Sequence, residues 1–535
     1  MVSVAESVAV LPNDVNQLKQ MVMENHLKAQ EWKQAYDKKE EERRELEAKF
    51  NLLRHAFFSR SSEKWTVDEH LQRRLFDEAE TAAVEETDTP GEVQMVAGYP
   101  RKNRGKRKPI PEDIPRDEII YDIPEKEKEC GCGSEMVRIG EEVSEDLDII
   151  PAEIKATRHV RLKYGCRVCE GSGNEDGPAV KVAPGPKKLL PKSIASAGLV
   201  AHIVTSKYCD ALPLYRQEKM FTRIGVDIKR SSMARWIIEL GKRVSPLLEL
   251  MDEKIRSGPV ALMDETRVQV HNEPGREDHT QSFMWVVRGG PPEKPYIRYM
   301  YHPTRSAAVP KAYLRNFKGM LQTDFYPGYL QIGAQEGITH VHCLAHARRK
   351  LDEAVKASGG SRAASEFIAI IQKIYRAEKQ LREKELSDDE FVRLRKEEVT
   401  PYFEKLEKHL QKKIDHVAPS SALGKAIHYL QDVLPGIKRY LDSPYLTPDT
   451  NSVERSIRPF VIGRRNWIFS DTPRGAHASA AFYSLIESAK SAKLEPYWYM
   501  RYVLNRLPEI EETGKWEELL PEGLSSKSLR APPPS

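Results

Sequence analysis

The chain has 535 residues, of which 40% are hydrophobic, and this size suits about three or four folded domains rather than one. No apolar run reaches the roughly 18 residues needed to cross a bilayer, and the first residues lack the basic segment of a secretory signal, so we expect a cytoplasmic protein without membrane partners. The formal net charge of +4 averages over acidic and basic stretches. Local charge is therefore the better guide to function.

The first predicted element is a long helix. Within residues 15–57, selected positions repeat in alternating steps of three and four, which is the heptad spacing of a coiled coil. Asn25, Lys39 and Arg43 interrupt the apolar seam and would fix its register. We predict a coiled-coil arm over residues 1–64 that joins copies of the chain into a homo-oligomer. An amphipathic helix folded back on its own chain is the alternative.

Residues 65–108 are predicted to form a linker that is first acidic and then basic. Its end, 101–108, holds six positive residues and no acidic one. Such a segment binds a nucleic-acid backbone by releasing counterions, without reading the base sequence. A solvated linker is the alternative. The candidate DNA-binding residues of this segment are Arg101, Lys102, Arg104, Lys106, Arg107 and Lys108.

Four of the six cysteines fall into two close pairs, Cys130 with Cys132 and Cys166 with Cys169. They lie at the ends of strands in a small β-rich module predicted over residues 109–185. Four thiolates suit a tetrahedral Zn²⁺, which would stabilise a module too small for a good core of its own. Loop cysteines without metal are the alternative, since the first pair is spaced more tightly than usual. The strands predicted here are 119–123, 146–150 and 155–164.

Residues 186–257 are predicted to be helical, with two helices joined by a short turn. Ser231 or Ser232 can cap the second helix. Basic residues cluster around the turn, among them Arg230 and Arg235, which would contact DNA in a helix-turn-helix motif. A helical hairpin that only packs on its neighbours is the alternative. The predicted helices are 195–223 and 232–255, and the turn is 224–227.

The following stretch predicts a mixed sheet. Hairpin-connected strands are followed by a helix and by a strand that leads into Asp324, and one more strand comes after it. Asp264 closes the first strand, so adjacent strands would place Asp264 and Asp324 side by side. This order is that of a ribonuclease-H-like mixed α/β core, and we predict a multidomain α+β protein built around it. The predicted strands are 259–264, 268–271, 283–287, 296–301, 319–323 and 339–343, and the helix is 305–317.

The catalytic core is predicted in two pieces that a helical insertion separates. A final helix begins near Asn451 and brings Glu454 back to the sheet. The predicted boundaries are 258–346 for the first piece, 347–446 for the insertion, 447–505 for the second piece and 506–535 for a C-terminal tail.

Three acidic residues carry the functional prediction, namely Asp264, Asp324 and Glu454. A carboxylate at the end of a buried strand is costly unless a hard cation neutralises it, which indicates a divalent-metal site. Two Mg²⁺ or Mn²⁺ ions held by three carboxylates can activate an attacking oxygen on one side of a phosphodiester and stabilise the leaving oxygen on the other. The sequence therefore predicts metal-dependent phosphoryl transfer.

Each acid taken alone has a structural alternative. Glu454 fits a capping box in the first turn of its helix, and Asp324 fits the start of a turn. Glu265 could replace its neighbour Asp264. Strand alternation favours Asp264, because it shares a face with the apolar residues of the strand whereas Glu265 points away.

Basic residues accompany these acids. A basic surface with Trp467 at its end suits a nucleic-acid backbone and a stacked base. His342, Cys343 and His346 could form a metal cluster, but a basic helix on phosphate accounts for the same stretch. Cys209 and Cys343 are interpreted as buried thiols. The candidate DNA-binding residues of this region are Arg348, Arg349, Arg455, Arg458, Arg464 and Arg465.

Taken in order, these motifs resemble the large transposases of the bacterial insertion sequence sixty-six group, members of the DDE class. The tripeptide Asp264-Glu265-Thr266 is one matching stretch. The others are 59–64, the paired cysteines, 207–216, 321–329, 343–350 and 451–469, so the resemblance extends from the predicted coiled coil to about residue 499.

The resemblance implies that Asp264, Asp324 and Glu454 are the catalytic acids. It also implies that the arm and the cysteine module help to bind double-stranded DNA, and that the substrate is the terminal inverted repeats of the element itself. Accessory proteins of the same element are further expected partners. A ribonuclease-H-fold nuclease that only hydrolyses and a non-catalytic DNA-binding regulator are the alternatives.

Overall fold

The computed structural model describes residues 14–58, 154–165, 180–358 and 360–530. The chain divides into two compact units, of which Ala82–Pro186 is one and the remaining residues are the other. The basic segment 101–108, the predicted strands 119–123 and 146–150, and the four paired cysteines lie outside the described residues. None of the described helices is both long enough and apolar enough to cross a membrane.

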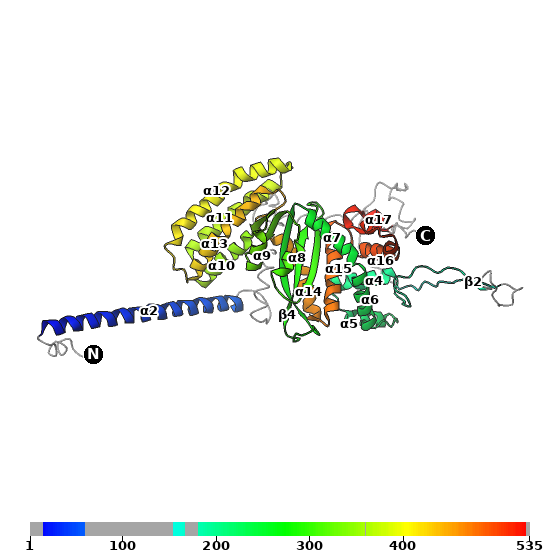
Figure 1. Cartoon of the computed structure of the whole chain (residues 1–535), viewed down its shortest axis with the longest axis horizontal. Helices are drawn as coiled ribbons and strands as arrows, with labels where there is room; N and C mark the ends of the chain where they lie inside the picture. Colours follow the sequence, from blue (N-terminus) through cyan, green and yellow to red (C-terminus); the bar gives the residue numbers. More distant parts are fainter. Residues whose placement is uncertain (1–13, 59–153, 166–179, 359, 531–535) are drawn as a thin grey trace, which may run out of the picture. The chain divides into compact units, whose positions relative to one another are not determined.

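The N-terminal element is the helix α2 (Val15–Phe58), which spans 44 residues (Figure 1). Large apolar side chains along it are exposed, among them Trp32 at 79% and Leu46 at 71%. Near its end, Asn51 Nδ2 donates a hydrogen bond of 3.1 Å to the carbonyl of Ala357. A lone helix that leaves apolar side chains in water gains little stability from them. Pairing with a second copy remains our prediction for this surface.

Removing residues 1–58 is expected to lower the self-association of the chain, measured as the mass in solution by light scattering. Val22 and Met23 provide a matched pair of substitutions, because they are 67% and 69% exposed but only Val22 lies on the heptad stripe. Val22→Glu should weaken association, since the added charge would be buried in the seam. Met23→Glu should not. If the number of chains per particle, calculated from the measured mass, stayed the same after the deletion, the coiled coil would be rejected.

In the unit Ala82–Pro186, the described residues form one antiparallel pair of strands, β1 (Lys163–Gly165) and β2 (Val180–Val182). The strand predicted over 155–164 is therefore wrong in extent, because it begins only at Lys163. Residues 154–162 are exposed and have no described partner strand. Alternating side chains do not form a strand unless a neighbour accepts the ladder hydrogen bonds.

The single helix predicted over 195–223 is wrong, because the chain forms two helices there, α4 (Ala197–Tyr208) and α5 (Leu214–Arg223). Pro213 stands immediately before α5 and has no amide proton with which to continue a preceding helix. Ala211 adopts a positive φ of 55°, which also ends helical backbone geometry.

The helix predicted over 232–255 is divided in the same way into α6 (Arg230–Arg243) and α7 (Ser245–Ser257), and a proline lies in the first turn of α7. Neither Ser231 nor Ser232 caps α6. Lys229 occupies the capping position and makes no side-chain cap bond. The hairpin of α5 and α6 is present, and Arg230 and Arg235 lie within the first turns of α6.

A mixed sheet occupies the centre of the larger unit, in the order β5-β4-β3-β6-β7, with β8 also paired to β3. Neighbouring strands are antiparallel from β3 to β5 and parallel from β3 to β7. The mixed α+β class is thus confirmed. The strands are β3 (Val260–Val270), β4 (Gln281–Gly289), β5 (Tyr296–His302), β6 (Gly319–Thr323), β7 (Ile338–His342) and β8 (Phe469–Ser470).

Two predictions within the sheet need correction. The strands predicted at 259–264 and 268–271 are one strand, β3, because the residues between them keep their pairing with β4, for example Thr266 opposite Met284. The helix predicted over 305–317 is reduced to α8 (Ala308–Tyr313).

Two helices that follow the insertion pack on the sheet (Figure 1). α14 (Asn451–Trp467) packs on β3 and β4, and α15 (Pro473–Ser491) packs on the edge strand β5. The hydroxyl oxygens of two serines of α15, Ser484 and Ser488, accept hydrogen bonds of 2.8 and 2.9 Å from backbone amides of β5. An edge strand leaves such groups unpaired, so these serines cover the edge. The remaining elements are α9 (Pro327–Gly333), α16 (Pro496–Thr513), α17 (Ser526–Arg530), η3 (Trp516–Leu519) and η4 (Pro521–Gly523).

A group of helices separates β7 from α14. At its centre the side chain of Arg395 is fully buried and forms an ion pair of 2.9 Å with Glu378. Arg395 also donates to the backbone carbonyl of Leu446, which lies on the segment that leads into α14. The insertion therefore helps to fix the start of α14. Its helices are α10 (Leu344–Ala357), α11 (Arg362–Arg382), α12 (Asp388–Ile414), α13 (Ala422–Lys438) and η2 (Arg439–Asp442).

Candidate active site

The register between β3 and β6 places two of the predicted acids next to each other. Val260 lies opposite Met320, and the pairing continues to residues 262 and 322. The same register continued by two residues brings Asp264 beside Asp324, which follows the last residue of β6. Asp264 therefore lies within β3 rather than at its end. It still borders an open pocket, because β6 stops before it.

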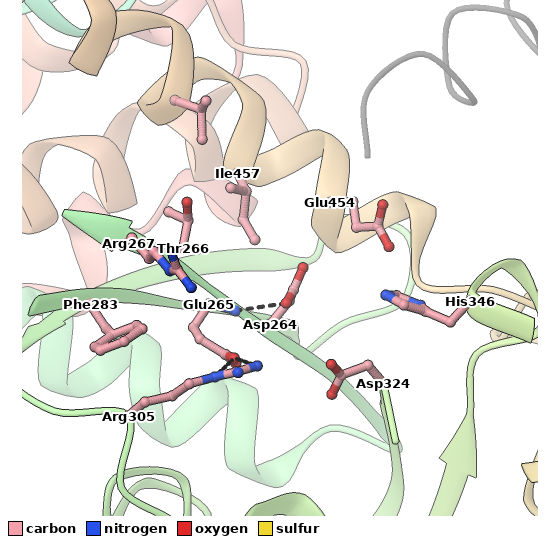
Figure 2. Close-up of a pocket in the computed structure, with 11 residues that line it drawn as sticks. Asp264, Glu265, Thr266, Arg267, Phe283, Arg305, Asp324, His346, Glu454 and Ile457 are labelled. Carbon is pink, nitrogen blue, oxygen red and sulfur yellow. Dashed lines mark hydrogen bonds and ion pairs between the residues drawn. The ribbon is translucent and has the colours of Figure 1, made fainter. Parts of the chain in front are cut away.

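The third acid comes from the first turn of α14. Glu454 is only 5% exposed, and the hydroxyl Oγ1 of Thr450 lies 3.0 Å from its Oε1. Asp264, Asp324 and Glu454 lie around one cavity (Figure 2). The volume of this cavity is about 190 Å³. The other residues that line this cavity are Glu265, Thr266, Arg267, Phe283, Arg305, His346, Ile457 and Val461.

Burial and the repulsion between carboxylates disfavour the ionised forms of Asp264 and Asp324. Burial raises the pKa of Asp264 well above its ordinary value, and the charges of Glu265, Glu454 and Asp324 raise it further. Burial and then Glu265 raise the pKa of Asp324 to about 6, against hydrogen bonding by the Tyr326 amide. Clustered carboxylates of this kind fit a hard divalent cation, which prefers oxygen ligands and relieves their repulsion.

Glu265 points away from Asp264, toward Arg305 (Figure 2). The hydroxyl of Tyr329 donates to Glu265 Oε2 at 2.5 Å, and Arg305 forms an ion pair with Oε1. Glu265 is thus paired with one cation and hydrogen-bonded to one hydroxyl. No local pattern predicts this arrangement, because Arg305 and Tyr329 lie far along the chain from Glu265. Arg305 also stacks on the ring of Tyr326, 3.9 Å from its centroid.

A further residue of the pocket is His346, from the first turn of α10. In the described part of the chain, one set of three side chains places its ligand atoms within 4.8 Å of one another, and it consists of Cys343, His346 and Glu454. Asp264 and Asp324 do not belong to this set. His342, considered with this cluster from sequence, instead has its Nδ1 3.2 Å from the carbonyl of Val433 on α13, which accepts the hydrogen bond, and its ring packs against Phe325.

The two lone cysteines differ in burial. Cys343 is buried, as predicted, and burial raises its pKa to about 12, so it stays a neutral thiol. Its sulfur lies 3.3 Å from the amide of Thr450, the residue before α14. Cys209, at the end of α4, is only partly buried.

The predicted DNA-binding residues are spread over several elements. Arg230, Arg235, Arg455 and Arg465 are exposed, and Arg348, Arg349 and Arg458 are partly exposed. Arg464 donates to the carbonyl of Arg267 on β3, which gives it a structural contact as well.

Trp467 does not present an open face for a base. The Lys207 ammonium lies over its ring, 3.9 Å from the centroid, and Tyr208 packs against it edge-on. The stacking role predicted for Trp467 would require Lys207 to move.

Comparison with known proteins identifies the class. The region that holds the sheet, the insertion and the three acids, residues 192–478, matches the model described as "Transposase IS66 family". This match covers more than half of the chain, so the chain belongs to the IS66 transposase family. Three further models match: "zinc-finger binding domain of transposase IS66" at 127–170, "Transposase C of IS166 homeodomain" at 45–119 and "IS66 C-terminal element" at 484–521.

Individual relatives come from Sinorhizobium fredii. The uncharacterized protein y4jD is 33% identical over 424 residues, which cover 77% of this chain and 81% of the relative. The uncharacterized protein y4qI is 30% identical over 474 residues, which cover 85% of each chain. The similarity thus extends well beyond the matched sheet region.

The zinc-finger match contains all four paired cysteines, Cys130, Cys132, Cys166 and Cys169. We predict about one zinc ion per chain in the purified protein, measured by elemental analysis, because four thiolates complete a tetrahedral site. Cys166→Ser should remove the zinc and weaken DNA-end binding before it affects the catalytic fold. Cys209→Ser serves as the control and should keep the zinc. A purified protein without zinc would contradict the prediction.

Proposed function

We propose that the chain is a DDE-type DNA transposase that cleaves and joins DNA at the terminal inverted repeats of its own insertion sequence, with Asp264, Asp324 and Glu454 as the catalytic acids. The observation that carries this proposal is the convergence of three carboxylates, one buried and two partly buried, from β3, the end of β6 and α14, on one pocket. The membership in a transposase family supports it. We assign the sheet to the ribonuclease-H-like type on its strand order.

The residues of the pocket fit two divalent cations, Mg²⁺ or Mn²⁺, which when bound would polarise the phosphodiester and stabilise developing charge. Asp264 would contribute to both ion sites, Asp324 to one and Glu454 to the other. Phe283, Ile457 and Val461 give the pocket an apolar wall. Such a wall lowers the local dielectric constant and strengthens the electrostatic contacts within it.

Two cationic side chains are placed to meet the negative charge of the substrate. The positive charges of Arg305 and Arg349 both act on Asp324. Arg305 lies at the pocket rim, where it also neutralises Glu265. We assign these two arginines to the DNA backbone near the reacting phosphate, with the remaining basic residues named above along the bound duplex.

The decisive experiment uses the full chain with labelled duplex DNA that carries the terminal repeats, a target plasmid, and Mg²⁺ or Mn²⁺. Joining of the labelled ends to the target supports the transposase. Cleavage without joining would favour a nuclease that only hydrolyses, and binding without cleavage would favour a regulator. Either of these two results overturns the proposal.

A further inference from the structure

His346 occupies a position in the acid pocket that a DNA-contacting role does not explain. Its ring points toward the pocket, close to Glu454 (Figure 2). Its Nδ1 is shielded from solvent and has no hydrogen-bond partner among the described residues. A shielded polar atom without a partner costs free energy, so it indicates a ligand, water or ion that would bind there.

The neighbours of His346 indicate which kind of ligand is missing. Ligand atoms of His346, Glu454 and Cys343 lie within 4.8 Å of one another, which is close enough for a shared ion. The sulfur of Cys343 already accepts hydrogen bonds from the amide and the hydroxyl of Thr450. Glu454 and His346 both line the acid pocket, whereas Cys343 does not. These two residues offer a carboxylate and an imidazole to an ion in the pocket.

We propose that His346 is a metal ligand, which joins Glu454 in binding one of the two divalent cations of the active site and makes that site favour Mn²⁺ over Mg²⁺. This inference rests on the proposed metal-dependent function and adds a fourth protein ligand to it. Imidazole nitrogen binds transition-metal ions well, whereas Mg²⁺ prefers an all-oxygen octahedral shell. The ion site of Asp324, built from carboxylates, would lack this preference.

Two other features agree with a ligand role. Burial, followed by the charges of Arg349 and Lys350, lowers the pKa of His346 to about 3, so its ring is neutral at physiological pH. The ring is also positioned by rigid elements, because His346 lies in the first turn of α10, directly after the buried strand β7. A ligand on such a support needs little rearrangement to bind.

The test is pulsed electron paramagnetic resonance of Mn²⁺ bound to the full chain, which detects a directly coordinated ¹⁴N nucleus. The wild-type protein should show this coupling. Labelling its histidines with ¹⁵N should replace the ¹⁴N coupling with a ¹⁵N coupling, which assigns the signal to histidine without any substitution. His346→Gln should lose the coupling and bind Mn²⁺ about tenfold or more weakly, on the scale of lost metal-site contacts. Its affinity for Mg²⁺ should change much less, because glutamine still offers an oxygen.

His416, an exposed residue after α12, provides the matched control, and His416→Gln should keep the coupling. Asp264→Asn should weaken Mn²⁺ binding, which shows that the signal comes from the pocket. Mn²⁺ binding that depends on Asp264 but shows no ¹⁴N coupling would overturn the histidine assignment and leave the transposase proposal intact. Absence of any Mn²⁺ binding that depends on Asp264 would overturn both.

Discussion

Asp324→Asn is expected to abolish strand transfer, leave DNA binding near the wild-type level, and stabilise the cation-free protein. Catalysis should fall by about three orders of magnitude or more, the scale on which single catalytic groups act. Binding should persist, because the basic residues that contact the DNA backbone are unchanged. The asparagine retains an oxygen that can accept the hydrogen bond of 3.2 Å from the Tyr326 amide, so the local turn is kept.

The gain in stability follows from the raised pKa of Asp324. Folding moves this pKa from 3.8 to about 6, so the folded state disfavours the ionised carboxylate. The penalty is absent below about pH 4, grows as the pH rises, and is complete above about pH 6. A shift of this size corresponds to about 3 kcal/mol. Asp324→Asn removes the penalty, so the free energy of unfolding should rise by up to that amount at pH 8 and change little near pH 4.

Urea unfolding in the presence of a chelator at pH 8 and pH 4, together with DNA-binding and strand-transfer assays, would measure these effects. Asp432, an exposed aspartate of α13, supplies the control, since Asp432→Asn should alter neither stability nor activity. If Asp324→Asn lowered DNA binding as much as it lowered strand transfer, Asp324 would be structural. If it destabilised the protein at pH 8, the assignment of a repulsive acid pocket would be wrong.

Most of what the sequence predicted about the sheet depends on local patterns. The strand 319–323 is found with the predicted bounds, because a short apolar run ends at a polar turn. Asp264 and Asp324 lie close to each other because the strands β3 and β6 pair in parallel. The helix at Asn451 also begins where its sequence indicates. These features need only side-chain periodicity and the order of elements along the chain.

The errors and omissions come from interactions between distant residues. Because β3 stays paired with β4, it continues across polar residues that, in sequence alone, resemble a break between two strands. The ion pair of Glu265 with Arg305, its hydrogen bond from Tyr329, and the approach of His346 to Glu454 join segments that only the folded sheet and insertion bring together. The sequence stretch CLAH at 343–346 suggested a cluster with His342, whereas in the fold Cys343 and His346 lie close to Glu454.

Glu378→Ala should cost the larger unit about 3–5 kcal/mol of unfolding free energy, because it leaves the guanidinium of Arg395 buried without a counter-charge. The side chain of Arg395 is fully buried and that of Glu378 is only 5% exposed. Two hydrogen bonds of Arg395, each 3.1 Å long, hold the carbonyls of Tyr440 and Leu446. Loss of the pair should therefore also loosen the segment that leads to α14 and reduce strand transfer, although Glu378 lies outside the acid pocket.

An ion pair on the surface of α12 provides the control for this effect. Arg393 and Glu397 are 2.9 Å apart, but their side chains are 60% and 56% exposed, so water already solvates both charges. Glu397→Ala should change the free energy of unfolding by less than about 0.5 kcal/mol, the usual range for an exposed pair. Urea unfolding followed by circular dichroism would compare the two variants. A loss below about 1 kcal/mol for Glu378→Ala would mean that water or other groups solvate Arg395, and that the insertion does not depend on this pair to fix the catalytic helix.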